Sequence, residues 1–337
     1  RLAASAIYFL EYVGAGREGN IKVIQLQNNN YDRKPCHRGK RNKGRKRGKR
    51  MSMHPALQYP FDPQIILRKR RSIKNELLEN GGGFIEKRIA ILGGSTTHDI
   101  REILELFLLD YGIRPSFYES DYGMYWRDAV FGNPELDAFR PDVVFIHTSS
   151  RNITAFPAVS DSPEKIDALL ESQAGRFTAM WDRLFEKYDC AIIQNNFELP
   201  YFRLLGNKEA VDIHGRINFI TRLNERFYSY ARAHGNFFIN DINYLSASYG
   251  LEKWLNPLYW HMYKYALCVP AIPILAHNVA KIIKSIYGRN KKALVLDLDN
   301  TLWGGVVGDD GVEGIEIGRE TPLGEATPAG MAKLMAL

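Results

Sequence analysis

Short apolar runs alternate with long amphipathic segments through residues 65–287, and this alternation restricts the fold more than any other feature of the sequence. Apolar runs bounded by turn residues predict strands at Arg88–Leu92, Pro115–Glu119, Asp142–His147, Ala191–Gln194 and Phe237–Asn240. Apolar residues at helical spacing predict helices at Ile65–Glu79, Asp99–Tyr111, Glu164–Tyr188, Glu209–His234 and Pro270–Tyr287. Because strands and helices take turns along the chain, we expect an α/β fold in which helices cover both faces of a doubly wound parallel sheet.

A second α/β unit is predicted to begin after Arg289-Asn290, with an apolar run over Lys291–Leu296. We expect this run to be a buried parallel strand, which places Asp297 and Asp299 where open α/β sheets bind ligands. Alternate residues of an extended segment point the same way, so both carboxylates can face one site. Such a pair suits Mg²⁺ and a phosphorylated substrate, with one carboxylate attacking phosphorus and the other moving a proton.

Three other interpretations of this Asp-x-Asp pair have to be weighed against a phosphoryl-transfer site. The acids could simply cap the junction of a strand and a turn, which is the commoner role of an isolated Asp-x-Asp. A calcium-binding EF-hand loop is excluded, because Leu302 stands at the position of its glycine and Gly308 at the position of its last glutamate. The metal-binding Asp-x-Asp of a nucleotide-sugar glycosyltransferase stays open, although it needs a nucleotide-binding unit upstream.

Ser95 lies in a tight turn between a predicted strand and a predicted helix, directly after Gly93 and Gly94. Glycine lets the backbone turn sharply and approach a ligand, and N–H groups at the start of the next helix favour an anion. The position suits a nucleophile or a phosphate-binding turn, although a purely structural turn is at least as common. The segment His147–Asn152 follows another predicted strand and would reach the same edge of the sheet.

The charge of the chain is divided unevenly between its first 50 residues and the rest. Residues 1–50 contain 14 Lys and Arg but only 3 Asp and Glu, whereas the remaining residues carry a net charge of −4. The run Arg33–Arg50 holds 11 basic residues and no acid, a composition that favours disorder and can bind nucleic acid without specificity. Since Met51 and Met53 follow directly, we interpret residues 1–50 as a basic disordered leader that is not native, with a nucleic-acid tail as the lesser alternative.

The cysteines and the hydropathy predict a cytoplasmic protein. Cys36, Cys190 and Cys268 are odd in number and widely spaced, which argues against a disulfide framework or a zinc site and for a reducing compartment. The sequence has no uninterrupted apolar run of roughly 18 residues, so we expect no membrane span.

The sequence around the carboxylate pair resembles a known motif. LVLDLDNTLWGGVVGDDG, residues 294–311, resembles motif I of the haloacid dehalogenase (HAD) superfamily, and in particular of its subfamily IIIC, the FkbH-like proteins. GIEIGRETP, residues 314–322, is similar to that family as well. Upstream, ILGGSTT (91–97) and IHTSSRNI (146–153) resemble the SGNH-like N-terminal domain of the same proteins.

The resemblance implies a Mg²⁺-dependent enzyme that works through an aspartyl-phosphate. Asp297 is then the nucleophile and Asp299 the acid/base, and both hold the metal. In FkbH-type members this chemistry accompanies transfer of a glyceryl unit from an acyl phosphate to an acyl carrier protein, for polyketide precursor supply. In the SGNH-like domain, the resemblance places Ser95 at the nucleophile position and Asn152 at the position of the asparagine that helps to bind the oxyanion.

Two alternatives to this function stay open. One is an SGNH-like acyl hydrolase or acyltransferase that uses Ser95, and the other is a non-catalytic binding protein. The expected partners are a phosphorylated small molecule or acyl phosphate and an acyl carrier protein. Neither a membrane nor, apart from the basic leader, a nucleic acid is expected.

The SGNH resemblance has a gap at the catalytic base. SGNH hydrolases carry an Asp three residues before the catalytic His, but Leu258 stands three residues before His261. Asp241 could replace that Asp only through the fold. We therefore expect His261, like His147 and His98, to be structural or at the surface, and a serine without an oriented histidine is a weak nucleophile.

The HAD resemblance also stops early. Only 40 residues follow Asp297, and Lys333 lies too close to it to be the lysine that the superfamily carries downstream. We expect residues 51–288 to form an SGNH/flavodoxin-like domain, and residues 289–337 to be the incomplete start of a Rossmann-like HAD domain. A chain that ends there is expected to lack phosphatase turnover.

Overall fold

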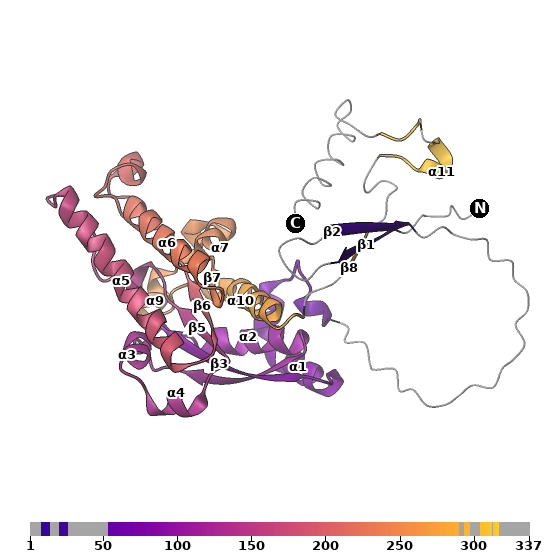
Figure 1. The fold of residues 1–337 in the computed structure, drawn as a ribbon, viewed down its shortest axis with the longest axis horizontal. Coiled ribbons are helices and arrows are strands. Elements are labelled where there is room, and N and C mark those ends of the chain that lie inside the picture. Colours follow the sequence, from indigo (N-terminus) through magenta and orange to yellow (C-terminus); the bar gives the residue numbers. More distant parts are fainter. Residues whose placement is uncertain are drawn as a thin grey trace, which may run out of the picture. The chain divides into compact units, whose positions relative to one another are not determined.

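The structure is a computed structural model that describes residues 8–13, 20–25, 53–289, 293–296, 304–311 and 313–316 (Figure 1). The chain divides into two compact units. One is formed by Arg47–Arg289, and the other by Arg1–Lys46 together with Asn290–Leu337. Each unit has a sheet of its own.

The larger unit is built on a five-stranded sheet with the strand order β4-β3-β5-β6-β7. All neighbouring strands in it run parallel. Its strands are β3 (Ile85–Gly93), β4 (Ile113–Glu119), β5 (Val143–His147), β6 (Ala191–Asn195) and β7 (Phe237–Asn240). The first strand of this sheet, β3, is an inner strand. β4 follows on one side of it, and β5, β6 and β7 follow on the other, which confirms the predicted doubly wound α/β fold.

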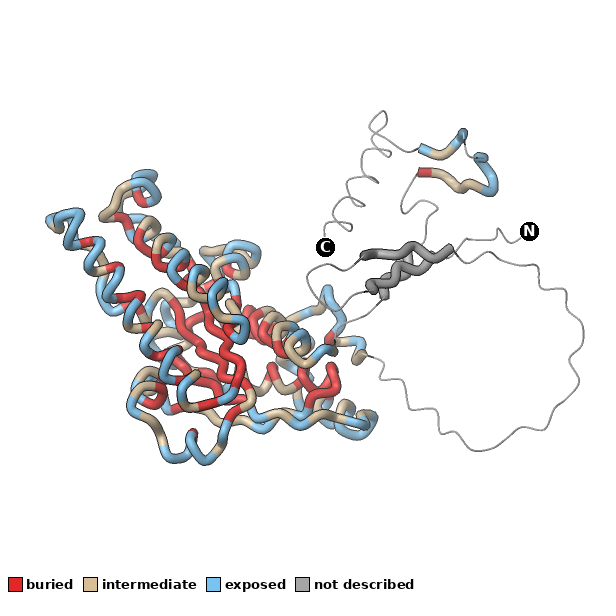
Figure 2. Tube along the Cα trace, in the orientation of Figure 1, coloured by how far each residue is buried: buried red, intermediate tan, exposed pale blue. Residues whose placement is uncertain are grey.

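Successive strand residues enter two separate cores, one on each face of the sheet. In β3, Ile89 and Ile91 pack into the first core, whereas Ala90 and Leu92 pack into the second. The first face is covered by α1 (Pro63–Asn80), α2 (His98–Asp110) and α10 (Ile272–Ile286), and the second by α3 (Tyr125–Val130), α5 (Pro163–Lys187) and α6 (Arg216–Ala233). Figure 2 shows the buried strands between helices whose outer surfaces are exposed. Because helices cover both faces, β5 and Ile89–Gly93 of β3 are buried along their whole length. Ile85–Arg88 of β3 and the edge strand β4 instead include exposed polar residues.

Shorter helices connect these main elements. They are η1 (Pro55–Leu57), α4 (Pro134–Phe139), η2 (Ser150–Asn152), η3 (Gly206–Ala210), α7 (Ile242–Tyr249), α8 (Leu251–Trp254), α9 (Pro257–Tyr263) and η4 (Val269–Ala271), where η denotes a 3₁₀ helix.

One predicted helix begins later than expected. The sequence pattern predicted a helix over Glu209–His234, but α6 starts only at Arg216. Gly215 explains the break, since a Cβ atom there would lie 2.2 Å from the carbonyl oxygen of Glu209. The Glu209 carboxylate accepts a hydrogen bond from the Ile217 N–H at 3.3 Å, so it satisfies a donor in the first turn of α6.

Within the described residues, the segment Val269–Ile286 is long and apolar enough to cross a membrane by composition, with a mean hydropathy of 1.2 over 18 residues. The sequence pattern predicted a helix over Pro270–Tyr287, and no membrane span was expected. Its apolar face lies in the first core, where Ile272, Leu275, Val279 and Ile283 are fully buried. We therefore describe it as a core helix of the α/β unit, and the cytoplasmic location stays a prediction.

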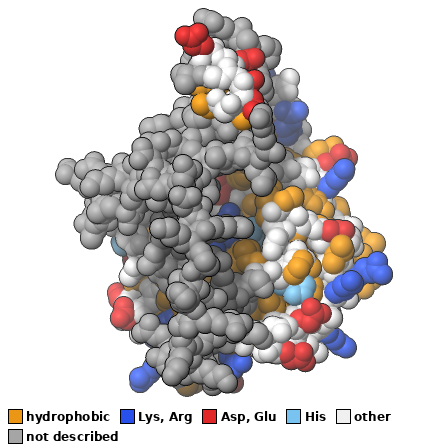
Figure 3. Space-filling view, turned by 90° about the vertical axis from the view of Figure 1, so that its right-hand side faces the viewer, with side chains coloured by type: hydrophobic (Ala, Val, Ile, Leu, Met, Phe, Trp, Pro, Cys, Tyr) orange, Lys and Arg blue, Asp and Glu red, His pale blue; other side chains and the backbone are white. Residues whose placement is uncertain are grey.

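The described surface carries charges of both signs. On the face drawn in Figure 3, the acidic and basic side chains of the described residues are interspersed and form no patch of one sign. The described cysteines, Cys190 and Cys268, are buried free thiols. Cys36 lies outside the described residues.

The smaller unit has an antiparallel sheet in the order β2-β1-β8, and a short helix, α11 (Val307–Asp310). Its strands are β1 (Tyr8–Val13), β2 (Asn20–Gln25) and β8 (Ala293–Leu296). The prediction that β8 is a parallel strand was wrong, because it pairs antiparallel with β1. An apolar run predicts a strand, but the direction of its partner depends on topology. The strands β1 and β2 lie within residues 1–50, whose assignment as a leader stays a prediction, and the basic run Arg33–Arg50 lies outside the described residues.

Candidate functional site

The Ser95 turn lies at the point where the sheet changes its direction of growth. β3 and β5 are neighbours, with Gly93 paired to His147 at their carboxyl ends, although β4 comes between them in the sequence. In doubly wound sheets, the crevice outside such a switch point is the usual ligand site. The predicted meeting of the Ser95 turn and the segment His147–Asn152 is therefore present in the structure.

Gly94 and Asn152 join the two loops at this switch point. The Gly94 N–H donates to the His147 carbonyl at 2.9 Å, and Asn152 Nδ2 donates to the Gly94 carbonyl at 3.2 Å. A Cβ atom at position 94 would lie 2.3 Å from Asn152 Nδ2, so any residue other than glycine would displace the Asn152 amide. Asn152 Oδ1 accepts from the Ser149 N–H at 3.0 Å, which fixes the orientation of the amide. One Nδ2 proton of Asn152 is thus committed to the turn, and the role of Asn152 in binding an oxyanion stays a prediction.

The hydroxyl of Ser95 is buried and has no hydrogen-bond partner within the described part of the chain. Its side chain lies in a residue that is only 3% exposed, and Oγ contacts neither a donor nor an acceptor. Burying an unpaired hydroxyl costs about 1–3 kcal/mol, so its retention requires a reason other than stability. A nucleophile needs a base that takes its proton, and no such base bonds to Ser95 in this structure.

The segment Tyr263–Tyr265 covers the Ser95 turn. The Thr96 N–H donates to the Lys264 carbonyl at 3.0 Å, and the Thr96 hydroxyl donates to the Tyr263 carbonyl at 2.6 Å. The Tyr265 hydroxyl donates to the Asp99 carboxylate in the first turn of α2. We call residues 256–265, which comprise α9 and this segment, the cap.

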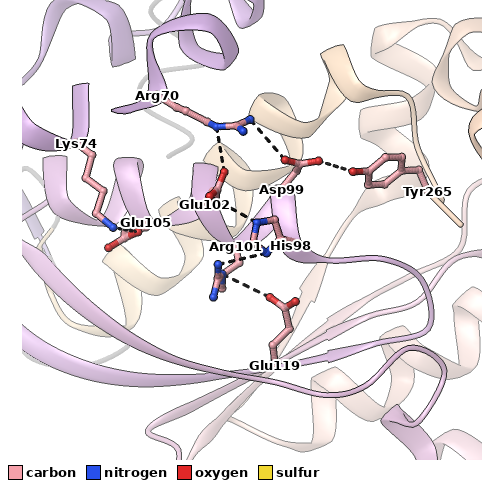
Figure 4. A network of polar contacts seen from close by, with 9 residues as sticks. All are labelled: Arg70, Lys74, His98, Asp99, Arg101, Glu102, Glu105, Glu119 and Tyr265. Carbon is pink, nitrogen blue, oxygen red and sulfur yellow. Dashed lines mark hydrogen bonds and ion pairs between the residues drawn. The ribbon is translucent and has the colours of Figure 1, made fainter. Parts of the chain in front are cut away.

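A network of charges holds the cap to the helices beneath it (Figure 4). Arg70 of α1 lies between two acids of α2, at 3.5 Å from Asp99 and 3.0 Å from Glu102. Asp99 therefore contacts both α1 and Tyr265 of the cap. The contacts of this network come from α1, α2, β4 and the cap, so the first turn of α2 is fixed from several sides.

None of the three histidines considered as a base is paired with Ser95. His261 lies exposed on α9, and its ring has no hydrogen-bond partner among the residues that the structure describes. Asp241 accepts from the Tyr244 N–H and caps α7. His98 lies at the surface beside Glu102, at 3.5 Å. These contacts support the expectation that the two histidines are not oriented as catalytic bases.

His147 is the buried histidine of the switch point. Burial lowers the pKa of its imidazole to about 4, so the ring is neutral at physiological pH. Asn195 Nδ2 lies 2.9 Å from its Nδ1 and donates to it, which places the imidazole proton on Nε2. This Nε2 has no partner in the structure, so His147, like Ser95, presents an unsatisfied polar atom in the interior.

The second predicted site cannot be compared with the structure, because Asp297 and Asp299 lie outside the described residues. β8 ends at Leu296, immediately before Asp297. Within the described residues, no group of three or more His, Cys, Asp and Glu side chains is arranged to hold a metal ion. The assignment of Mg²⁺ to Asp297 and Asp299 therefore stays a prediction.

A cavity of about 580 Å³ lies beside the switch point and was not predicted. It is lined by Ser150 and Arg151 after β5, by Glu198 after β6, and by residues of α6, α8 and α9. Glu198 is buried, and it accepts hydrogen bonds from the Ser150 hydroxyl at 2.8 Å and from the Ser150 N–H at 3.2 Å. Burial raises the pKa of its carboxyl to about 7.

The sequence contained a signal for part of this cavity. Glu198 follows a predicted strand of a parallel sheet, so it lies at the same edge as Ser95. Arg151 is inside a segment that was singled out, although no role was assigned to it. Arg216 and Trp260 come from distant parts of the sequence, and only the fold brings them to the cavity.

Comparison with known proteins places the α/β unit in a family. Residues 88–284, more than half of the chain, match the sequence model described as FkbH, N-terminal domain. No curated protein sequence matches the chain significantly.

One of the solved structures that match the chain shares its fold. The N-terminal part of the protein BF1531 from Bacteroides fragilis, containing a phosphatase domain complexed with Mg, matches with a TM-score of 0.66 and 24% identity. That match covers 80% of this chain and 69% of that chain. The C-terminal catalytic domain of peptidoglycan O-acetyltransferase A from Streptococcus pneumoniae matches with a TM-score of 0.34 and 15% identity, over 64% of this chain and 99% of that domain. The first likeness shows the fold alone, and the second carries no argument.

Proposed function

This chain belongs to the FkbH family through its N-terminal domain, and from that premise we propose that it takes part in Mg²⁺-dependent phosphoryl chemistry on a phosphorylated small molecule. The observation that carries the proposal is the motif at Asp297 and Asp299, which stands directly after strand β8. The Bacteroides fragilis relative, whose phosphatase domain was crystallised with Mg, supports the choice of reaction and of metal.

The two carboxylates have separate roles in the proposed reaction. The Asp297 carboxylate attacks phosphorus and forms an aspartyl-phosphate, while the bond from phosphorus to the leaving oxygen breaks. Asp299 donates a proton to that oxygen and takes one from the group that attacks next. Mg²⁺ held by both residues would offset the negative charge of the transferred phosphoryl group. The donor set suits this ion, because Mg²⁺ favours carboxylate and carbonyl oxygens.

We further propose that the substrate carries an acyl phosphate, and that its acyl unit, a glyceryl group in FkbH-type members, is passed to an acyl carrier protein in a step separate from the aspartyl-phosphate reaction. In that step the carrier thiol attacks the acyl carbon, the bond from this carbon to the phosphate oxygen breaks, and phosphate leaves with the thiol proton. The resemblance of the two sequence motifs to FkbH-like proteins supports this assignment. The role in polyketide precursor supply rests on the same resemblance.

The test is phosphatase activity of the full-length gene product with acetyl phosphate, in the presence and absence of Mg²⁺. Activity should require Mg²⁺ and should fall at least about 10³-fold in Asp297→Asn, since the nucleophile is lost. Asp189→Asn, an exposed acid of the α/β unit, is the matched control and should retain activity. Equal activity of Asp297→Asn and the wild type would refute the proposal.

A second candidate function is acyl hydrolysis or acyl transfer at Ser95. It is favoured by the unpaired Ser95 hydroxyl, which lies at the switch point beside Asn152. Ester cleavage measured with p-nitrophenyl acetate separates the two functions. Loss of cleavage in Ser95→Ala together with retention in Asp297→Asn would favour the second, whereas no cleavage by the wild type would leave the α/β unit as a binding domain.

A further inference from the structure

The cavity beside the switch point has mainly apolar walls. Phe156, Leu199, Trp254 and Trp260 contribute to them, together with other aliphatic and aromatic residues. Its volume of about 580 Å³ falls within the range of roughly 300–1,000 Å³ that small-molecule sites occupy. Ser95 does not line the cavity, so its occupant need not be a substrate of Ser95.

Two arginines line this apolar cavity, and both lie over aromatic rings. The Arg151 guanidinium lies 4.3 Å from the centre of the Trp260 ring, and the Arg216 guanidinium lies 5.0 Å from the centre of the Phe156 ring. No carboxylate among the described residues forms an ion pair with either arginine. Stacking on a ring leaves the in-plane N–H groups of a guanidinium available, so both side chains can still donate to an anion.

The nearest buried acid does not neutralise these arginines. Glu198 is turned to Ser150, from which its carboxyl accepts two hydrogen bonds at 2.8 and 3.2 Å. Its raised pKa means that the carboxyl is partly neutral near pH 7, which weakens its attraction for Arg151. Glu252, the other acid that lines the cavity, is exposed and forms no ion pair with either arginine among the described residues. The two acids therefore offset the charge of the two arginines only in part.

We infer that the cavity lined by Arg151, Arg216 and Trp260 binds an amphiphilic organic anion. The anionic group, a carboxylate, sulfonate or phosphate, is bound by the two guanidinium groups. The apolar body of the ligand, a chain or a ring, packs among the aromatic and aliphatic walls. This site adds a binding activity to the α/β unit, and it depends on neither Ser95 nor the proposed chemistry at Asp297.

The geometry favours a small anion over a nucleic acid. A nucleic-acid site needs a groove or surface with many basic side chains along a phosphate backbone. This cavity has two basic residues in an apolar hollow, which matches one anionic group on an apolar body.

The test is a fluorescence titration of the full chain with two dyes that differ in charge. 1-Anilinonaphthalene-8-sulfonate carries an anionic group on an aromatic body, and N-phenyl-1-naphthylamine is its uncharged counterpart. The variant is Arg151→Gln combined with Arg216→Gln. The matched control is Arg232→Gln, an exposed arginine of α6 that contacts Ser229 and does not line the cavity.

We expect the double variant to bind the anionic dye at least about tenfold more weakly, because it lacks the charge-assisted hydrogen bonds from the two guanidinium groups to the sulfonate. Binding of the neutral dye should change by less than about twofold, and Arg232→Gln should bind both dyes as the wild type does. Unchanged binding of the anionic dye, or an equal loss of both dyes in a folded double variant, would overturn the inference.

The single variants keep the test decisive if the double variant does not fold. Arg151→Gln and Arg216→Gln are then titrated separately, and each should weaken binding of the anionic dye severalfold. If neither single variant weakens it, the inference is wrong. The assay needs neither Mg²⁺ nor an acyl phosphate, so its outcome is independent of the proposed phosphoryl chemistry.

Discussion

At Gly94, the loops that follow β3 and β5 approach so closely that a side chain has no room. A Cβ atom there would lie 2.3 Å from Asn152 Nδ2. We expect Gly94→Ala to lower the free energy of unfolding by about 1–3 kcal/mol, measured by urea denaturation. Gly175→Ala in α5 is the matched control, because nothing lies within 4 Å of its added Cβ, and it should stabilise the protein by up to about 1 kcal/mol. Equal effects of the two substitutions would contradict the close packing at the switch point.

Glu198 is expected to make the stability of the protein depend on pH. Burial raises the pKa of its carboxyl from 4.5 to about 7, so the folded protein keeps a proton that the unfolded chain releases. This contribution to stability is fully present below pH 4.5 and is lost as the pH rises through about 7. Between pH 4 and pH 8, the free energy of unfolding of Glu198→Gln should rise by up to about 3 kcal/mol relative to that of the wild type. Denaturant unfolding at each pH measures this difference.

The other charged side chains that line the cavity with Glu198 are Arg151, Arg216 and Glu252. They are present in both proteins, so the difference between wild type and Glu198→Gln isolates the buried carboxyl. Glu252→Gln, which alters an exposed acid at the same cavity, is the control and should follow the wild type at every pH. Parallel stability curves for the wild type and Glu198→Gln would show that Glu198 does not titrate as described.

Among the secondary-structure elements, the cap is held to α2 through few contacts. Tyr265 donates to Asp99, and Thr96 donates to the carbonyls of Tyr263 and Lys264. We expect Tyr265→Phe to destabilise the protein by about 1 kcal/mol and to speed amide hydrogen exchange over residues 256–265. Tyr244→Phe is the control, because Tyr244 is 69% exposed and should change neither quantity. Unaltered exchange in the cap of Tyr265→Phe would show that this bond does not hold it.

The long elements could be predicted from the sequence because their signals are local. The apolar runs of β5, of β6 and of the second half of β3 are buried, and the stripes of α2 and α5 repeat over several turns. The start of α6 was predicted wrongly, because it depends on the contact of Gly215 with the backbone of Glu209. The short helices α7, α8 and α9 escaped prediction, since a helix of one or two turns has little periodicity and is set by packing.

Some features of the candidate sites could likewise be predicted from the sequence, and others could not. Ser95 and Asn152 each follow a predicted strand of a parallel sheet, and this predicted that they would meet at one edge of the sheet. The structure places both residues at that edge. Leu258, three residues before His261, already argued against an oriented base for Ser95, whereas the exposed position of His261 on α9 could only be read from the fold. Arg151, Glu198 and Arg216 line the cavity but lie in separate connections between the strands. No local sequence pattern therefore predicts that they form one cavity.

At the scale of the whole molecule, the α/β unit has a complete sheet and two cores of its own. We expect residues 51–289 to fold alone and to unfold in one cooperative transition, measured by circular dichroism during heating. A shorter piece, residues 51–250, is the control and should not fold, because it lacks the core helix α10. An unfolded 51–289 fragment would show that the smaller unit is needed for stability.

The cap reaches the Ser95 turn from far along the chain, and this has a consequence for biosynthesis. In the described part of the chain, the partners of the Thr96 N–H and hydroxyl are the carbonyls of Lys264 and Tyr263. A ribosome that adds about 5–20 residues per second needs on the order of ten seconds or more to travel between them. During that interval the nascent chain contains the Ser95 turn but not yet the cap that covers it. We therefore expect this loop to be accessible to a chaperone, a modifying enzyme or a ligand during synthesis, and to be covered in the finished protein.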